Sequence, residues 1–249
     1  MFARTWRFKS SFAHQARLMS KNPIPQIIGI GGFTFEPDTD KKIFKYVLEH
    51  TGKANPKILY VPTAQGDSPK SITWFYESFS GLGELTDVKF FPWPPENLKE
   101  FTLSHDAILI EGGNTANMLA IWRAHGFDKI LHEAWVQGIV LFGASAGMIC
   151  WFEAGVTDSF GPQLEGMKYG LGFLEGSACP HYDGEMNRRP KYEKLVVGGF
   201  PAGIAADDGV AIYYKGKEIS EIVTVRPDSS AYEVSAKGSK KLATKYLTS

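Results

Sequence analysis

The chain has few cysteines, no excess of either charge and no long apolar run, and each absence excludes a class of protein. Its two cysteines, Cys150 and Cys179, are too few for a disulfide framework or a metal quartet, so both are expected to be free thiols in a reducing compartment. Basic and acidic residues number 27 each, whereas nucleic-acid and membrane-surface proteins normally carry a basic excess. No apolar run approaches the roughly 18 residues of a membrane span. The 43% hydrophobic content instead indicates a globular protein with a core.

Acidic residues are also absent from the first 35 positions, while five basic side chains fall within the first 22. Such a basic, serine-containing segment is typical of an organelle transit peptide. It equally fits a disordered basic extension or a start codon placed too far upstream, and we favour these two interpretations. We therefore set residues 1–23 apart and predict a single α/β domain over residues 24–249. The predicted location is the cytoplasm, with organelle targeting left open.

Short apolar runs alternate with amphipathic helical segments in the first part of this domain. This pattern is typical of a mostly parallel sheet with helices on both faces. Strands are expected at residues 26–30, 57–61, 88–91, 107–110 and 139–142. Helices are expected to begin at Asp38 or Thr39, at Ser68-Pro69, at Thr115 and at Asp128. Further on, we expect a loop at 156–176, a strand at 177–182, a helix at 188–197, and a C-terminal β extension at 210–214, 218–225 and 231–234.

Three of the predicted strands end in glycine-rich segments. These are Gly31-Gly32, Gly112-Gly113, and the run from Gly143 to Gly147. In a parallel sheet the carboxyl ends of the strands meet at one edge, where ligand sites form. We therefore expect the three glycine-rich segments to face a common site.

The third of these segments is a G-x-S-x-G motif with Ser145 at its centre. An apolar strand precedes it and apolar helix formers follow, which is the context of a nucleophile elbow. Glycine is needed in such a turn because the backbones approach closely and a Cβ would clash. An ordinary strand-to-helix turn with a small residue at its apex would have the same local sequence. The rest of the chain has to distinguish the two.

A serine nucleophile needs a general base and an acid that orients it. Of the six histidines, His181 alone follows Ser145. The order of an α/β-hydrolase, serine, acid and then histidine, would draw the acid from Glu153, Asp158, Glu165 and Glu175, none of which lies at a clear strand end. The order serine, histidine, acid instead points to Asp207 and Asp208, directly before a predicted strand. An ordinary Asp-Gly turn is the alternative for that pair.

An acyl-transfer site also needs two backbone N–H donors for the developing oxyanion. Ala146, the residue after the candidate nucleophile, supplies one in any nucleophile elbow. The Gly112-Gly113-Asn114 strand end is the natural source of the other, because glycine permits close approach to a carbonyl. Such a segment could instead hold a phosphate. However, neither G-x-G-x-x-G nor a P-loop motif is present, so we rank this alternative lower.

With these residues in place, the sequence resembles the peptidase E family of serine peptidases, the α-aspartyl dipeptidases related to cyanophycinases. The resemblance lies in Gly112-Gly113-Asn114-Thr115, the G-x-S-A-G motif and Pro180-His181-Tyr182, in that order. It spans residues 26–225. It implies a flavodoxin-like, class I glutamine-amidotransferase-like fold and hydrolysis of dipeptides that have an N-terminal aspartate.

The resemblance also implies roles for single residues. Ser145 corresponds to the nucleophile, His181 to the base, and Gly113 and Ala146 to the oxyanion donors. Asp208 aligns best with the orienting acid, with Asp207 adjacent. Glu111 departs from the family, which often has a third glycine at this position. Asn114, Arg188 and Arg189 are the candidates for substrate binding, because an acidic substrate side chain calls for a guanidinium.

The predicted function is thus a serine-type dipeptidase without a metal or other cofactor. A small peptide is its expected partner, nucleic acid and membrane are not, and a homodimer is left open. Two alternatives stay open at this point. One is an esterase or amidase acting on another small acyl substrate, and the other is a non-catalytic binding protein of the same fold.

Overall fold

The computed structural model describes residues 23–248, so all of the predicted basic extension except Pro23 lies outside the described residues. The larger of two sheets has eight strands in the order β14-β11-β10-β1-β5-β4-β2-β3. Their bounds are Gln26–Ile30 (β1), Lys57–Val61 (β2), Glu84–Asp87 (β3), Ala107–Ile110 (β4), Val140–Ala144 (β5), Val210–Lys215 (β10), Glu218–Thr224 (β11) and Lys245–Tyr246 (β14). The run from β1 to β3 is parallel throughout, whereas β10 pairs antiparallel with both β1 and β11.

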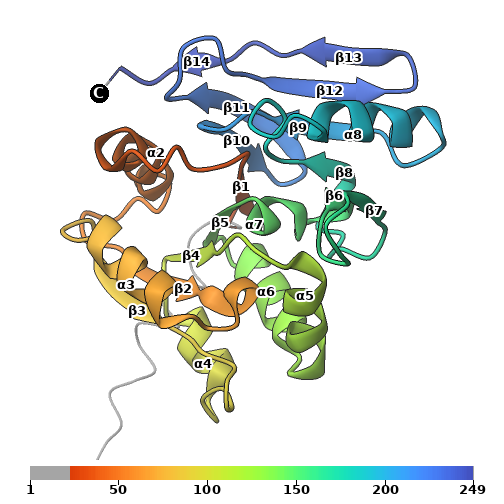
Figure 1. The fold of residues 1–249 in the computed structure, drawn as a ribbon. Coiled ribbons are helices and arrows are strands. Elements are labelled where there is room, and N and C mark those ends of the chain that lie inside the picture. The colour runs from red at the N-terminus through yellow and green to blue at the C-terminus, as the bar shows by residue number, and fades with distance from the viewer. Residues whose placement is uncertain (1–22, 249) are drawn as a thin grey trace, which may run out of the picture.

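Helices cover both faces of this sheet (Figure 1). They are Pro37–Glu49 (α2), the 3-10 turn Pro62–Gln65 (η1), Pro69–Ser78 (α3), Leu98–Leu103 (α4), Thr115–Ala124 (α5), Phe127–Val136 (α6) and Ala146–Ile149 (α7). Neighbouring strand residues enter different cores: Ile28 packs with α2 and α3, whereas Ile27 packs with α5 and α6. This alternation is the period of a strand buried on both sides. The predicted layered α/β arrangement is confirmed.

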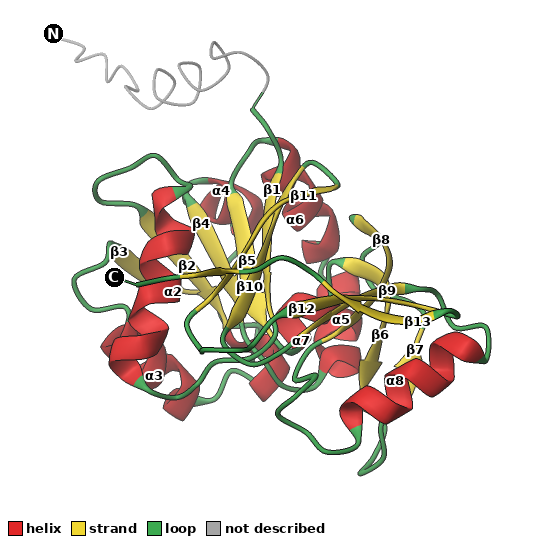
Figure 2. Ribbon diagram, turned by 90° about the horizontal axis from the view of Figure 1, so that it is seen from above, coloured by secondary structure: helices red, strands yellow, loops and turns green. Residues whose placement is uncertain are grey.

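The second sheet has six strands in the order β13-β12-β9-β8-β6-β7 and lies to one side of the first (Figure 2). Its strands are Phe152–Thr157 (β6), Glu165–Met167 (β7), Leu174–Cys179 (β8), Gly203–Ala206 (β9), Ala231–Ser235 (β12) and Gly238–Lys241 (β13). Helix α8, Arg188–Val197, packs on it through Tyr192 and Val196. The predicted C-terminal β segments therefore belong to two different sheets.

Several predicted boundaries are wrong. The strand expected at 88–91 lies at Glu84–Asp87, and the buried Phe90 beyond it is held by the Asp67 carboxylate, which accepts a hydrogen bond from its backbone N–H. Helix α2 begins at Pro37 after Glu36, so neither Asp38 nor Thr39 is its cap. The Asp40 carboxylate accepts hydrogen bonds from the loop before the helix.

The segment 156–176 was expected to be a loop, but it contains the end of β6, all of β7 and the start of β8. The expected strand at 177–182 is accordingly displaced to Leu174–Cys179. Glycine obscured these strands in the sequence. At Gly155, for example, a Cβ would lie 2.5 Å from the Ile149 side chain, so close packing excludes the β-branched residues that usually mark a strand.

No helix within residues 23–248 is long and apolar enough to cross a membrane. Cys150 and Cys179 are both buried free thiols, as predicted. Burial raises the pKa of each thiol well above its ordinary value, so neither is an activated nucleophile.

Candidate active site

Ser145 lies at a strained turn between β5 and α7. Its backbone has φ 57° and ψ −115°, a conformation that is rare for any residue with a side chain. Strain of this kind persists only where the surroundings impose it, and it is concentrated at functional sites. Here the Ser145 N–H donates to the Ile30 carbonyl at the end of β1 (3.2 Å). Ser145 is therefore held at the carboxyl edge of the sheet, as a nucleophile elbow requires.

The two glycines of the motif permit this turn. A Cβ on Gly143 would lie 2.9 Å from the Cα of Gly147, and a Cβ on either residue would collide with the Ile110 carbonyl oxygen of β4. Three backbone segments thus meet where side chains would keep them apart. The structural reason for G-x-S-x-G in this chain is close packing of the turn against β4.

The three glycine-rich strand ends face one cavity, as predicted. The cavity has a volume of about 520 Å³, and Gly32, Gly112, Gly113, Ser145 and His181 all line it. Gly112 packs directly against the serine, since a Cβ there would lie 3.1 Å from Ser145 Cβ and 3.7 Å from its Oγ. A volume of this size is in the range of small-ligand sites.

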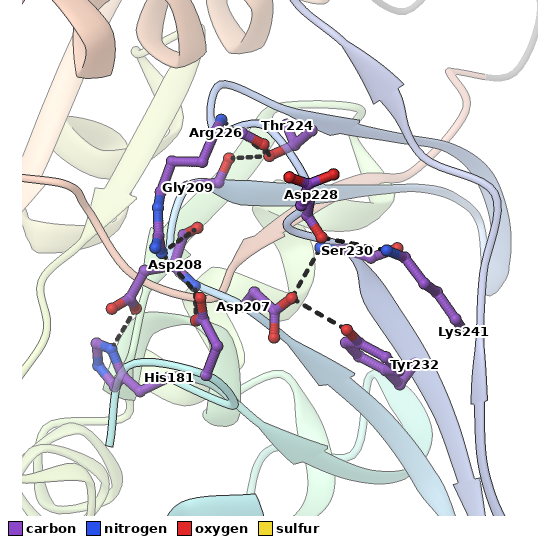
Figure 3. Close-up of polar contacts among 11 residues, drawn as sticks. His181, Asp207, Asp208, Gly209, Thr224, Arg226, Asp228, Ser230, Tyr232 and Lys241 are labelled. Carbon is purple, nitrogen blue, oxygen red and sulfur yellow. Dashed lines mark hydrogen bonds and ion pairs between the residues drawn. The ribbon is translucent and has the colours of Figure 1, made fainter. Parts of the chain in front are cut away.

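His181 enters the cavity from the loop after β8 and is paired with Asp208 (Figure 3). Its Nδ1 lies 2.7 Å from the Asp208 Oδ1, and the two side chains are 20% and 22% exposed. The backbone of His181 is also left-handed, with φ 54°, and its N–H donates to the Gly31 carbonyl (3.1 Å). A carboxylate on Nδ1 fixes the ring orientation and leaves Nε2 as the basic nitrogen.

Gly32 is a site residue whose role we did not derive from the sequence. A Cβ at Gly32 would lie 2.6 Å from His181 Nδ1 and would collide with Asp208 Oδ1. A Cβ at Gly184 would likewise collide with Asp208 Oδ2. Both glycines leave room for the histidine–aspartate pair. In the sequence, Gly32 is the second of two glycines after β1, and that pair indicates only the end of a strand.

Asp183 and Arg226 support the Asp208 backbone and were also missed. The Asp183 carboxylate accepts a hydrogen bond from the Asp208 N–H (2.9 Å). Arg226 donates both to Asp183 Oδ2 (3.0 Å) and to the Asp208 carbonyl (3.2 Å). These contacts join the histidine loop to the segment after β11, and nothing in their sequence spacing indicates them.

Asp207 is oriented away from His181 (Figure 3). It is 3% exposed, and its Oδ2 accepts hydrogen bonds from the Ser230 N–H (2.8 Å) and the Tyr232 hydroxyl (3.3 Å). Burial raises the pKa of this carboxyl, and the Ser230 N–H opposes the rise. Of the two adjacent aspartates, the structure brings Asp208 to His181 and uses Asp207 to join β9 to β12.

The two candidate oxyanion donors come from the segment after β4 and from the start of α7. Gly113 has φ 137°, which glycine adopts without strain, and a Cβ there would lie 2.5 Å from the Ala64 carbonyl oxygen. Ala146 is the first residue of α7, so its N–H has no acceptor within the helix. Ala146 directly follows Ser145, and Gly113 lines the same cavity as the serine.

The predicted substrate-binding residues do not line the cavity. The Asn114 side chain caps α5 by accepting from the Asn117 N–H (2.8 Å) and donates to the Ser159 carbonyl (3.0 Å). Arg188 is 3% exposed and donates to both Glu185 oxygens.

Arg189 is also committed elsewhere. It pairs with Glu193 (3.1 Å), and its guanidinium lies over the Tyr182 and Tyr232 rings. The sequence indicates these local pairs, because Glu185 lies three residues before Arg188 and Glu193 lies four residues after Arg189. The cavity wall contains other polar and charged groups instead.

That wall combines aromatic rings with two side chains of opposite charge. The aromatic residues are Phe33, Phe35, Tyr60 and Trp74. The charged residues are Lys70, which is exposed, and Glu111, which is partly buried. Burial raises the pKa of Glu111 to about 7. Within residues 23–248, no group of three or more His, Cys, Asp or Glu side chains could hold a metal ion.

The chain is similar to known peptidases. The model of the family described as Peptidase family S51 matches residues 27–222. The uncharacterized peptidase YgaJ of Bacillus subtilis (strain 168) is 44% identical over 209 residues, which are 83% of this chain and 90% of that protein.

Two crystal structures are similar in fold. A peptidase from an acI-B1 Actinobacterium has a TM-score of 0.64 at 17% identity, over 90% of this chain and 96% of that one. A candidate peptidase E protein from Listeria monocytogenes EGD-e has a TM-score of 0.58 at 18% identity, over 88% and 100%. At these identities the likeness concerns the fold, and it agrees with the flavodoxin-like class expected from the sequence.

Proposed function

The chain belongs to peptidase family S51, and we propose that it hydrolyses small peptides through Ser145, His181 and Asp208. One observation carries this proposal. A histidine whose Nδ1 is held by a carboxylate shares a cavity with a serine at a strained strand-to-helix turn. Nucleophile, base and orienting acid are the parts that acyl transfer requires.

In the first half of the reaction the Ser145 Oγ attacks the carbonyl carbon of the scissile bond. Its proton passes to His181 Nε2, and Asp208 stabilises the resulting imidazolium. The carbonyl oxygen becomes an oxyanion, to which Gly113 and Ala146 donate their N–H groups. When the tetrahedral intermediate collapses, the C–N bond breaks and His181 gives the proton to the leaving amine.

The second half releases the acyl group. Water loses a proton to His181 as its oxygen attacks the ester carbon of the acyl-enzyme. The oxyanion forms again beside the same two N–H groups. Collapse breaks the bond to Ser145, whose Oγ regains the proton from His181. The free acid leaves and the enzyme is restored without any further reactant.

For the substrate we propose a dipeptide with an N-terminal aspartate. A cavity of about 520 Å³ is suited to a molecule of this size. Lys70 lines it and offers an ammonium group to the substrate carboxylate, the part first assigned to Arg188 and Arg189. A lysine binds a carboxylate as a point charge rather than through a bidentate fork, so it discriminates less sharply than an arginine.

The test is hydrolysis of Asp-X dipeptides by the wild type and by Ser145→Ala. We expect the alanine variant to lose activity by about 10⁴-fold or more. Its folding should be unaffected, and a thermal melt checks this. Full activity in a folded alanine variant would overturn the assignment of the nucleophile.

The aromatic wall favours one second candidate, an esterase or amidase that acts on a more apolar acyl group. Phe33, Phe35 and Trp74 could pack against such a group. A panel of activated esters compared with Asp-X dipeptides separates the two candidates by their ratio of kcat/KM. A serine-reactive fluorophosphonate adds a check for turnover of either kind, since failure to label Ser145 in folded protein would favour a non-catalytic binding role.

A further inference from the structure

Glu111 is an acidic side chain in the wall of the catalytic cavity that the proposed reaction does not use. It follows β4 and precedes Gly112, the glycine that packs against Ser145. Its N–H donates to the Val61 carbonyl at the end of β2 (3.4 Å). Because neighbouring Cα atoms are about 3.8 Å apart, its backbone is fixed close to the nucleophile. Glu111 also lines the same cavity as Ser145 and His181.

The surroundings of this carboxyl lack a counter-charge. Its Oε2 is shielded from solvent and, like the Tyr60 hydroxyl, has no hydrogen-bond partner of regular geometry among the described residues. Burial raises the pKa of Glu111 to about 7 and outweighs the opposing effect of the Ser71 and Tyr60 hydroxyls. The charge of Asp67 makes a smaller contribution to the rise. Burial remains the dominant influence, so the ionised carboxyl is unfavourable at this position, and a cation placed beside it in the cavity would offset this penalty.

The group most suited to supply that cation is the substrate itself. The carbon next to a scissile carbonyl carries the α-nitrogen, which is a primary ammonium in a peptide with a free N-terminus. Glu111 lies two residues before Gly113, whose N–H is proposed to bind the carbonyl oxygen, and both residues line the cavity. Lys70, elsewhere on the same wall, carries the charge that complements an aspartate side chain.

We propose that Glu111 binds the α-ammonium group of the substrate and makes the enzyme selective for peptides with a free N-terminus. This inference rests on the proposed function, because it assigns Glu111 a place beside the acyl group of that reaction. Ionised Glu111 and the ammonium form a charge-assisted hydrogen bond that exists only in the complex. Acetylation of the substrate nitrogen removes both the charge and two of its donors.

The experiment compares aspartyl p-nitroanilide with N-acetyl-aspartyl p-nitroanilide, each hydrolysed by the wild type and by Glu111→Gln. The wild type should prefer the free amine by at least about tenfold in kcat/KM, the scale of a hydrogen bond to a charged group. Glu111→Gln should lose this preference mainly through KM and leave the rate on the acetylated substrate within about threefold. Glu165→Gln, an exposed glutamate of β7, is the matched control and should behave as the wild type.

Two outcomes would overturn the proposal. In one, Glu111→Gln keeps the full preference for the free amine. In the other, N-acetyl-lysyl p-nitroanilide is cleaved and its hydrolysis depends on Glu111, so that the carboxyl binds a side-chain ammonium instead. Either result leaves the proposed function intact as long as Ser145→Ala is inactive. Activity in Ser145→Ala would instead refute the proposed function.

A measurement on the wild type covers the case in which Glu111→Gln does not fold. A proton on Glu111 competes with the ammonium, so the preference for the free amine should fall by up to about tenfold per pH unit below 7. Titration of a catalytic group affects both substrates and cancels in their ratio. The other titratable groups that act on Glu111 are Tyr60 and Asp67, and Lys70 and His181 line the same cavity. A ratio that is constant from pH 5 to pH 7 would contradict the proposal.

Discussion

The serine half and the histidine half of the candidate site are built in different ways. Ser145 lies in a motif of five consecutive residues at the end of one strand, and this motif contacts Ile30, Ile110 and Gly112 at the ends of the neighbouring strands. His181 and Asp208 are 27 residues apart. They meet only because the loop after β8 is hydrogen-bonded to the end of β1 and to the segment before β10.

This difference separates a local motif from a tertiary one. In the serine half, the strained residue and the two closely packed glycines lie within five consecutive positions. The motif can therefore be recognised in the sequence. In the histidine half, each contact joins segments distant in sequence: Gly31 to His181, Asp183 to Asp208, and Arg226 to both aspartates. Mutations should therefore affect the two halves differently.

The sharpest comparison is between Asp208→Asn and Asp207→Asn. Asp208→Asn should lower kcat by about 10³–10⁴-fold, because the amide no longer favours the required histidine tautomer. Asp207→Asn should leave kcat within a few-fold and lower the free energy of unfolding by about 1–2 kcal/mol, through weaker hydrogen bonds to Ser230 and Tyr232. Steady-state kinetics and urea unfolding measure both effects. The opposite pattern would mean that Asp207 is the orienting acid.

Glycine substitutions compare the two halves directly. Gly32→Ala should reduce kcat by about 100-fold, since its Cβ displaces the His181–Asp208 pair. Gly147→Ala should reduce kcat and should also lower the free energy of unfolding by about 1–3 kcal/mol. The reason is that its Cβ would collide with the Ile110 backbone, which cannot move easily. Gly161→Ala is the control, as nothing lies within 4 Å of a Cβ there. If Gly32→Ala is as active as Gly161→Ala, the close packing of the histidine half is not needed for activity.

Arg226 tests how much support the histidine half needs. Arg226→Ala should lower kcat by about tenfold with little change in KM, because the Asp208 carbonyl and the Asp183 carboxylate lose their contacts with Arg226 while the Asp208 carboxylate remains. Lys217→Ala removes another exposed ion pair, with Glu175, and should change neither kinetics nor stability measurably. An unchanged kcat in Arg226→Ala would show that Gly32 and Gly184 suffice to hold the pair.

The smallest expected effect concerns the pH dependence of stability at Asp207. The folded-state pKa of this carboxyl is raised above its ordinary value of 3.8, mainly by burial. Its contribution to stability is therefore fully present below that value and is lost as the pH rises through the folded-state pKa. The stability difference between wild type and Asp207→Asn should shrink as the pH rises from 4, as followed by thermal unfolding. A difference that grows would mean that the Ser230 N–H outweighs burial.

The local pattern of the sequence determined much of this protein. Apolar runs such as Ile58–Val61 are buried on both faces of the sheet, and a run of that kind predicts a covered parallel strand. The G-x-S-x-G motif located the turn, and chain order selected His181. Glycine-rich β6 and β7 were missed because strand signals depend on side chains that close packing excludes there.

Only the tertiary structure decided which of two adjacent aspartates faces the histidine. Asp207 directly follows β9 and contacts Ser230 and Tyr232, whereas Asp208 lies in the turn before β10 and reaches His181. Which aspartate reaches His181 depends on how the segment between β9 and β10 lies against the end of β1. Contacts with Gly32, Asp183 and Arg226 determine the position of this segment. The same holds for Arg188 and Arg189, whose partners lie on their own helix and its neighbours rather than in the cavity. Side-chain chemistry is local, whereas the direction in which a side chain points depends on contacts between distant parts of the chain.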